Sequence, residues 1–199
     1  MDIALAAPTG RAAKRLSEAA SMEAKTIHRL LEMQFSADES SVFMRDENNL
    51  LDEDVIIIDE SSMIDVFLMS ALLKALKPSA RLILIGDADQ LPPVGPGYVF
   101  RDIIESERFS TVVLTHIFRQ ARESDIVVNA HAINSGNYPK VSGRTGDYFF
   151  IECDENNIEN MVNGLVQTRL PRAYGFDSFE DIQILCPSRK RRGGTQNLN

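Results

Sequence analysis

Apolar runs alternate with amphipathic segments along this chain, and the alternation predicts strands that lead into helices. The clearest apolar run covers residues 55–58, where one valine is followed by three isoleucines. Consecutive β-branched residues are typical of a strand that is buried on both faces of a parallel sheet. Apolar runs at residues 2–7 and 81–85 predict two further strands, the second of them also buried. We therefore expect an α/β fold built on a parallel sheet.

Amphipathic spacing predicts the helices that connect these strands. Arg11 and Arg15 stand four residues apart after the turn at residues 8–10, as on one face of a helix. Thr26 and Asp65 are residue types that cap helices, and each stands directly before a segment with helical periodicity. Helices are accordingly expected at residues 27–32, 65–77, 124–133 and 158–170.

Polar segments predict the loops and the division into domains. Residues 36–54 are expected to form a loop or a weak hairpin, and residues 86–97 a stiff loop that contains three prolines and three glycines. Residues 136–146 are expected to link a first domain, residues 1–135, to a second one, residues 147–199. Short strands are also expected at residues 111–114, 148–151 and 182–185.

Composition adds little to the prediction of the fold, but it restricts the classes of protein to which the chain can belong. The chain has 199 residues, of which 44% are hydrophobic and 25% charged, as in ordinary soluble globular proteins. No apolar run approaches the roughly 18 residues of a membrane helix, and the first residues lack the basic start of a signal peptide. Only Cys153 and Cys186 are present, which is typical of free thiols in a reducing compartment. We expect a cytoplasmic protein without a membrane partner.

The net charge of −8 argues against a protein that coats nucleic acid through bulk electrostatics. It leaves room for a local basic track, because phosphate contacts need only a few well-placed cations. The basic start of the helix after residues 8–10 is one candidate, since free backbone N–H groups at a helix start also receive phosphate. A solvated basic face remains an alternative for these residues.

Two carboxylates, Asp59 and Glu60, follow the central apolar run directly. In open α/β sheets, ligands bind beyond the carboxyl ends of the strands, so both acids are expected at the functional edge. In nucleotide hydrolysis one acid holds the magnesium shell and a second orients or deprotonates the attacking water. A solvated turn, or a cap for the next helix, is the alternative.

Taken together, these segments resemble the ATPase core of superfamily 1 DNA helicases of the RecD/TraA type. The resemblance covers the whole chain in the order of the family's motifs. Its segments are residues 8–13 (motif Ia), 26–29 (the threonine-histidine segment), 59–60 (motif II), 86–94 (motif III), 118–120 (motif IV), and 184–188 with Gly194 and 198–199 (the opening of the second motor domain).

One family motif is missing from the sequence. No G-x-x-x-x-G-K-[ST] phosphate loop occurs, and in the family this loop lies just upstream of motif Ia. We therefore expect an internal fragment: a first RecA-like P-loop NTPase domain without its first strand and phosphate loop, followed by the start of a second one. Such a fragment is expected not to hydrolyse ATP by itself.

The resemblance implies ATP and Mg²⁺ as cofactors and assigns roles to individual residues. Asp59 would hold Mg²⁺ through its water shell, Glu60 would act on the attacking water, and Gln90 would couple the γ-phosphate to DNA. Arg119 would reach the γ-phosphate across the cleft between the motor domains. The residues implied to face single-stranded DNA are Pro8, Thr9, Gly10, Arg11, Thr26 and His28.

The expected function is therefore part of an ATP-dependent helicase that moves along single-stranded DNA, 5′-to-3′ by the family's example. A non-catalytic nucleic-acid-binding module of the same fold stays open as an alternative, and so does a superfamily 1 ATPase that acts on RNA. Partner subunits of a nuclease or recombination complex, and a pathway in repair, recombination or conjugation, are equally open.

Overall fold

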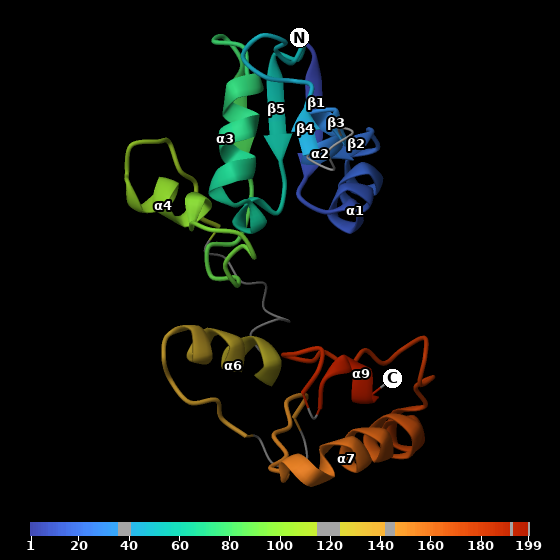
Figure 1. The fold of residues 1–199 in the computed structure, drawn as a ribbon. Helices are drawn as coiled ribbons and strands as arrows, with labels where there is room; N and C mark the ends of the chain where they lie inside the picture. Colours follow the sequence, from blue (N-terminus) through green and yellow to red (C-terminus); the bar gives the residue numbers. More distant parts are fainter. Residues whose placement is uncertain (36–40, 115–123, 142–145, 192, 199) are drawn as a thin grey trace. The chain divides into compact units, whose positions relative to one another are not determined.

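The computed structural model describes residues 1–35, 41–114, 124–141, 146–191 and 193–198. The chain divides into two compact units, Met1–Thr115 and His116–Asn199 (Figure 1). Within the described ranges, no helix has the length and apolar character needed to cross a membrane.

A four-stranded parallel sheet forms the centre of the first unit, in the order β2-β1-β5-β6 (Figure 1). The strands are β1 (Ile3–Ala7), β2 (Ala24–Thr26), β5 (Val55–Ile58) and β6 (Arg81–Leu84). Every neighbouring pair is parallel, so that the strands end at the same edge. The predicted α/β fold with a parallel sheet is confirmed.

Three helices of the first unit begin at side-chain caps, of which Thr26 and Asp65 were expected and Thr9 was not. The Thr9 hydroxyl caps α1 (Gly10–Ala20), the Thr26 hydroxyl caps α2 (Ile27–Leu30), and Asp65 caps α3 (Val66–Ala75). A fourth helix, α4 (Val99–Glu105), follows the loop after β6. Hydroxyl and carboxylate oxygens accept backbone N–H groups that have no partner within the helix, which is why these residue types start helices.

The core of this unit lies between the sheet and two of the helices. Side chains that alternate along β1 and β5 meet apolar residues of α2 and α3, and helix α1 packs on β1 and β2. Ile56 and Ile58 of β5 are completely buried. The buried members of this cluster are Ala4, Ala6, Ile27, Leu30, Leu31, Leu51, Ile56, Ile58, Ile64, Met69, Leu72 and Ala75.

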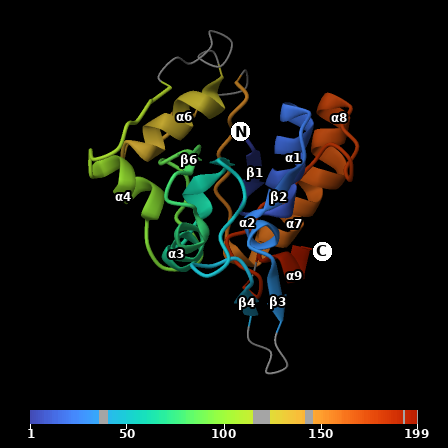
Figure 2. The ribbon, with the colours of Figure 1, turned by 90° about the horizontal axis from the view of Figure 1, so that it is seen from above.

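An antiparallel hairpin follows α2, as Figure 2 shows; only its second strand lies within residues 36–54, where a loop or a weak hairpin was expected. Its strands are β3 (Met33–Phe35) and β4 (Ser41–Phe43), while residues 36–40 lie outside the described part of the chain. Beyond β4 the chain is bonded to the end of α2, because the N–H groups of Met44 and Arg45 both donate to the Leu31 carbonyl at 3.2 Å.

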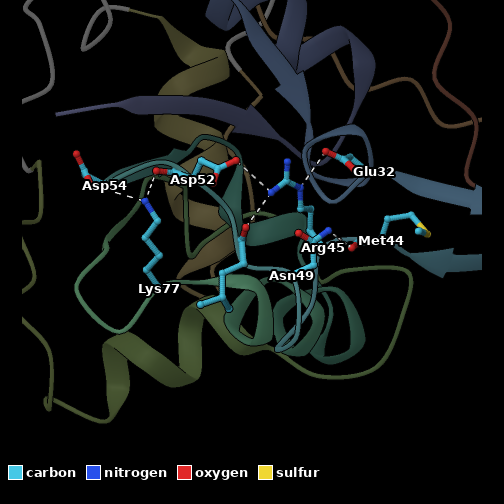
Figure 3. A network of polar contacts seen from close by, with 8 residues as sticks. Glu32, Met44, Arg45, Asn49, Asp52, Asp54 and Lys77 are labelled. Atoms are coloured by element: carbon cyan, nitrogen blue, oxygen red, sulfur yellow. Dashed lines mark hydrogen bonds and ion pairs between the residues drawn. The ribbon is translucent and has the colours of Figure 1, made fainter.

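Arg45 fastens the hairpin to the segment that leads into β5 (Figure 3). Its guanidinium donates to Glu32 Oε1 at 2.9 Å, to Asp52 Oδ2 at 3.2 Å and to the Leu50 carbonyl at 2.8 Å. The hydrogen bond to Glu32 is the largest cause that raises the pKa of Arg45. The planar, forked guanidinium can serve three acceptors at once, which a lysine ammonium does less well.

Several expected strands are wrong. Residues 111–114, 148–151 and 182–185 form no helix or strand and pair with no strand in the described part of the chain. Val112 is 87% exposed, so the apolar side chains of the first of these segments lack the packing that stabilises a strand. Strand β6 exists, but it is not buried: among the described residues it pairs only with β5, and Ile83 is 45% exposed.

In the described residues of the second unit, the regular secondary structure consists of helices. It contains α6 (Asp125–Asn134), α7 (Ile158–Gly164), a π-helical turn (Leu165–Arg169), α8 (Leu170–Tyr174) and α9 (Thr195–Leu198). The helix expected at residues 158–170 is therefore present and continues further. A short 3₁₀ turn, Glu155–Asn157, precedes it.

Helix α6 is held by the segment expected to be a linker. Asn129, which is 2% exposed, exchanges two hydrogen bonds with the Lys140 backbone at 2.7 and 2.8 Å. Asp147 accepts from the Ser124 hydroxyl at 2.6 Å, and this bond lowers the pKa of Asp147. The boundary between the two compact units precedes α6, and it therefore lies earlier in the chain than the expected linker at residues 136–146. The limits of the two domains stay a prediction.

We predict that Arg45→Ala destabilises the protein by about 1–2 kcal/mol, because a partly buried cation with three acceptors loses its hydrogen bonds. Urea unfolding measures this change. Lys74→Ala is the matched control, since Lys74 pairs with Glu47 at 3.9 Å on the surface and both side chains are 60% exposed. Removal of that pair should leave the free energy of unfolding unchanged within error. Equal effects of the two substitutions would contradict the role assigned to Arg45.

Candidate nucleotide and nucleic-acid site

The acidic turn directly continues the central strand. The Asp59 N–H donates to the Ala6 carbonyl at 2.9 Å, which extends the pairing of β5 with β1 by one residue. Asp59 Oδ1 accepts the N–H of Glu60 at 2.9 Å. Both side chains are half-buried at the carboxyl edge of the sheet. The acids therefore lie where the sequence predicts them, on a backbone that the sheet holds in place.

Glu60 adopts a left-handed backbone conformation, with φ 54° and ψ 38°. For a residue other than glycine this conformation costs roughly 1–2 kcal/mol. Such outliers persist where the surrounding structure fixes them, and they gather at functional sites. The turn then passes into a 3₁₀ helix, Ser61–Met63, whose last N–H donates to the Glu60 carbonyl at 3.1 Å.

The end of β6 is bonded to this acidic turn. The Ile85 carbonyl accepts the N–H of Ser61 at 2.8 Å, and the Ile85 N–H donates to the Ile58 carbonyl at 2.8 Å. Gly86 packs so closely that a Cβ there would lie 3.0 Å from the backbone nitrogen of Ser62. The acidic turn and the start of the loop at residues 86–97 thus form one packed unit.

The loop itself is folded by local hydrogen bonds. Asp87 Oδ1 accepts the N–H of Asp89 at 2.9 Å, and the Asp87 carbonyl accepts the N–H of Gln90 at 3.3 Å. At the far end of the loop, the Pro96 carbonyl accepts the first N–H of α3, that of Val66, at 2.9 Å. Gln90 is exposed between these two fixed ends.

A cavity of about 620 Å³ lies between this loop, α3 and the start of α1. Four of the predicted site residues line it: Pro8, Thr9, His28 and Gln90. The structure thus brings together three of the six residues expected to face DNA and the expected coupling residue. Asp59 and Glu60 are not among the described residues that line it.

Much of the cavity wall is apolar, and the sequence did not single out Phe43, Met63 or Phe67 in it. His28 lies against Phe43 of the hairpin, with ring centroids 5.9 Å apart at 42°. Met63 and Phe67, 44% and 71% exposed, come from the turn and helix that follow the acids. The remaining lining residues are Asp65, Leu68, Leu91, Pro92, Pro93, Val94 and Gly95. This surface forms only where segments that are distant in the sequence meet in the fold, so local patterns do not reveal it. Aromatic residues close to motif positions are a sequence signal that could have indicated it.

The other predicted DNA-facing residues lie at helix starts. Thr9 Oγ1 accepts the N–H of Ala12, and Thr26 Oγ1 accepts that of Arg29, both at 3.2 Å. Each hydroxyl still has its own proton to donate to an outside acceptor. Gly10 is exposed, as is its neighbour in the first turn of α1, Arg11. Arg119 lies outside the described residues.

The donor set at the acids fits a hydrated magnesium ion. Mg²⁺ keeps several waters and needs only one or two protein carboxylates beside the phosphates of a nucleotide. One oxygen of Asp59 is engaged by the Glu60 N–H, which leaves the other for the water shell of a metal ion. No cluster of three or more His, Cys, Asp or Glu that could hold a metal ion alone exists among the described residues.

Comparison with known proteins identifies the family. The model of the family described as AAA domain matches residues 1–156. The chain belongs to the AAA domain family. Its curated relatives include the ATP-dependent RecD2 DNA helicase of Deinococcus radiodurans, 34% identical over 100% of this chain and 26% of the relative. The RecBCD enzyme subunit RecD of Mycobacterium tuberculosis (strain CDC 1551 / Oshkosh) is 38% identical over 73% of the chain and 28% of the relative.

These matches confirm the predicted resemblance to RecD-type helicases, and the chain spans about a quarter of the length of these relatives. Solved structures of Pif1 helicases are also similar to this chain, at a lower sequence identity than these relatives. Bacteroides Pif1 in complex with ADP-AlF4 is 25% identical over 53% of this chain and 26% of that chain, with a TM-score of 0.33. The family assignment rests on the sequence matches.

Two neighbouring serines of the acidic turn are expected to respond differently to alanine. The Ser61 hydroxyl is fully buried and donates to the Ile58 carbonyl at 3.0 Å, so Ser61→Ala should cost about 1 kcal/mol. Within the described part of the chain the buried Ser62 hydroxyl has no hydrogen-bond partner, so Ser62→Ala should be neutral or stabilising. Chemical unfolding of both variants checks this order, and the reverse order would contradict the packing of the turn.

Proposed function

We propose that this chain is part of an ATP-dependent helicase motor that moves along single-stranded DNA. The observation that carries the proposal is the bonding of the acidic turn to Ile85, directly before the loop at residues 86–97, together with the packing of Gly86 on that turn. This arrangement joins residues suited to nucleotide hydrolysis to a cavity lined by Thr9, His28 and Gln90. A protein that couples ATP hydrolysis to movement needs such a connection between the site that binds the nucleotide and the site that binds the polymer.

At the nucleotide, the two acids have separate tasks. When bound, Mg²⁺ would neutralise charge on the β- and γ-phosphates. Asp59, with one carboxylate oxygen free, would hold the metal's water shell. Glu60 would orient the attacking water and accept its proton. Gln90 would sense the γ-phosphate from the neighbouring loop, and we extend the proposal to Arg119 as the cation that neutralises the transferred phosphoryl group.

At the polymer, we propose that Pro8, Thr9, Gly10, Arg11, Thr26 and His28 contact the backbone of single-stranded DNA. The start of α1 offers free N–H groups and a positive dipole end, both of which suit a phosphate. The apolar wall of the cavity suits the rings of unstacked bases. Contacts of this kind grip and release a polymer without reading its sequence.

The direction of movement and the partners are proposed from relatives alone. The relatives named above include a DNA helicase and a subunit of the RecBCD enzyme, so we propose DNA rather than RNA as the substrate, and a nuclease or recombination complex as a partner. Movement in the 5′-to-3′ direction rests on the family resemblance. ATP hydrolysis by the full-length protein with DNA or RNA as the stimulating polymer tests the choice of substrate.

Glu60→Gln in the full-length protein should bind ATP but hydrolyse it about 10²–10⁴ times more slowly, because an amide keeps the shape yet accepts no proton. Nucleotide binding by equilibrium titration and phosphate release by a steady-state assay measure the two effects. Turnover close to that of the wild type would show that another group activates the water.

Thr9→Asp separates the capping role of this residue from its proposed contact with DNA. Aspartate caps helices as well as threonine does and suits the positive end of α1, so the unfolding midpoint should not fall. A carboxylate near a DNA phosphate should weaken single-strand binding about fivefold at low salt, and less at high salt.

Thr9→Ser is the matched control, since it keeps both the cap and the hydroxyl donor. Fluorescence anisotropy with labelled single-stranded DNA measures the affinities. Equal affinities of the two variants would place DNA away from the start of α1.

A further inference from the structure

We propose that Asp65 is a positioning residue that holds the loop at residues 86–97 against helix α3 and thereby fixes where Gln90 lies. The inference deepens the proposed function, on which it rests: it names the connection through which the acidic turn and the DNA-facing loop influence each other. Asp65 lines the cavity, and neither its sequence position nor the family motifs assign it more than a helix cap.

The two oxygens of Asp65 do different things. Oδ1 accepts the N–H of Leu68 at 2.8 Å and so caps α3. Oδ2 points at Gly95, where a Cβ would overlap the carboxylate, and that Cβ would lie 2.8 Å from the Asp65 Cβ. Next to this contact, the Val66 N–H donates to the Pro96 carbonyl at 2.9 Å. The end of the loop is thus pressed onto the first turn of the helix.

Gly95 is a glycine because of this contact and not because of its backbone. Its φ is not among the positive values, unlike that of Gly97, which is 93°. A side chain at position 95 would therefore be conformationally allowed. What excludes it is the Asp65 carboxylate in the place where its Cβ would stand. The Asp65 carboxylate therefore occupies the space that a side chain at position 95 would need.

The loop is consequently fixed at two points with Gln90 between them. Gly86 packs on the backbone of the acidic turn, and Gly95 packs on Asp65. The turn and α3 are continuous, because the 3₁₀ helix Ser61–Met63 ends two residues before Asp65. A displacement of Glu60 is therefore passed to both ends of the loop, and a displacement of the loop by DNA is passed back to the acids.

Four variants of the full-length protein test the inference. Asp65→Ser still caps the helix, since serine is a preferred N-cap, but it is too short to fill the space beside Gly95. Asp65→Asn keeps both the cap and the shape and serves as the conservative control. Gly95→Ala introduces the overlap from the other side. The double variant Asp65→Ser with Gly95→Ala removes the overlap with Oδ2 but keeps the Cβ that would lie 2.8 Å away, so it relieves the overlap only in part.

Hydrogen exchange followed by mass spectrometry reports loop order without reference to any activity. For Asp65→Ser and Gly95→Ala we expect exchange about tenfold faster in residues 87–94, with the amides of α3 unchanged. Asp65→Asn should behave as the wild type. In the Asp65→Ser background, Gly95→Ala should have an effect about threefold smaller, because the closest overlap, that with Oδ2, is gone. Additive effects, or equally faster exchange throughout α3, would overturn the positioning role.

The second readout is the ratio of DNA-stimulated to basal ATP hydrolysis. We expect this ratio to fall about fivefold for Asp65→Ser and to be restored by Asp65→Asn. A loosened loop with an unchanged ratio would overturn the inference while leaving the proposed function intact. A wild-type protein without DNA-stimulated hydrolysis would overturn the proposed function instead, and the exchange experiment would still report whether Asp65 orders the loop.

Discussion

The first unit depends on the backbone hydrogen bonds that flank strand β5 on both sides. On one side the Asp59 N–H donates to Ala6, and on the other the Ile85 N–H donates to Ile58. Because both neighbours are parallel strands, these bonds place three strand ends at one edge of the sheet. The acidic turn, the loop at residues 86–97 and the start of α1 all begin there. Their common edge follows from strand pairing alone, before any side chain is considered.

Local patterns predicted the features that local physics determines. The β-branched run at residues 55–58 formed the buried strand, and Thr26 and Asp65 became caps. In each case a few neighbouring residues suffice, because branched side chains suit a pleated surface and short polar side chains reach nearby N–H groups. The resemblance to RecD-type helicases came from the order of the motifs, and the curated relatives confirm that resemblance.

The sequence failed where the outcome depends on distant partners. Residues 111–114 have the composition of a strand but no neighbouring strand in the described part of the chain. Strand β6 looks fully buried in the sequence, yet Ile83 is half-exposed because the strand lies at the edge of the described sheet. The apolar wall of the cavity was missed for the same reason, since Phe43 and Phe67 come from segments that meet only in the fold. The proposed role of Arg119 rests on the resemblance alone.

The left-handed backbone at Glu60 has a practical consequence for engineering. The position strains every L-residue with an ordinary side chain, whereas glycine and asparagine tolerate it. A library selected only for heat resistance or expression would therefore favour glycine or asparagine at position 60 and discard the proposed base. Directed evolution of this protein should therefore test the proposed hydrolysis in the same round as stability, because selection for robustness alone would yield well-folded proteins that lack the proposed base.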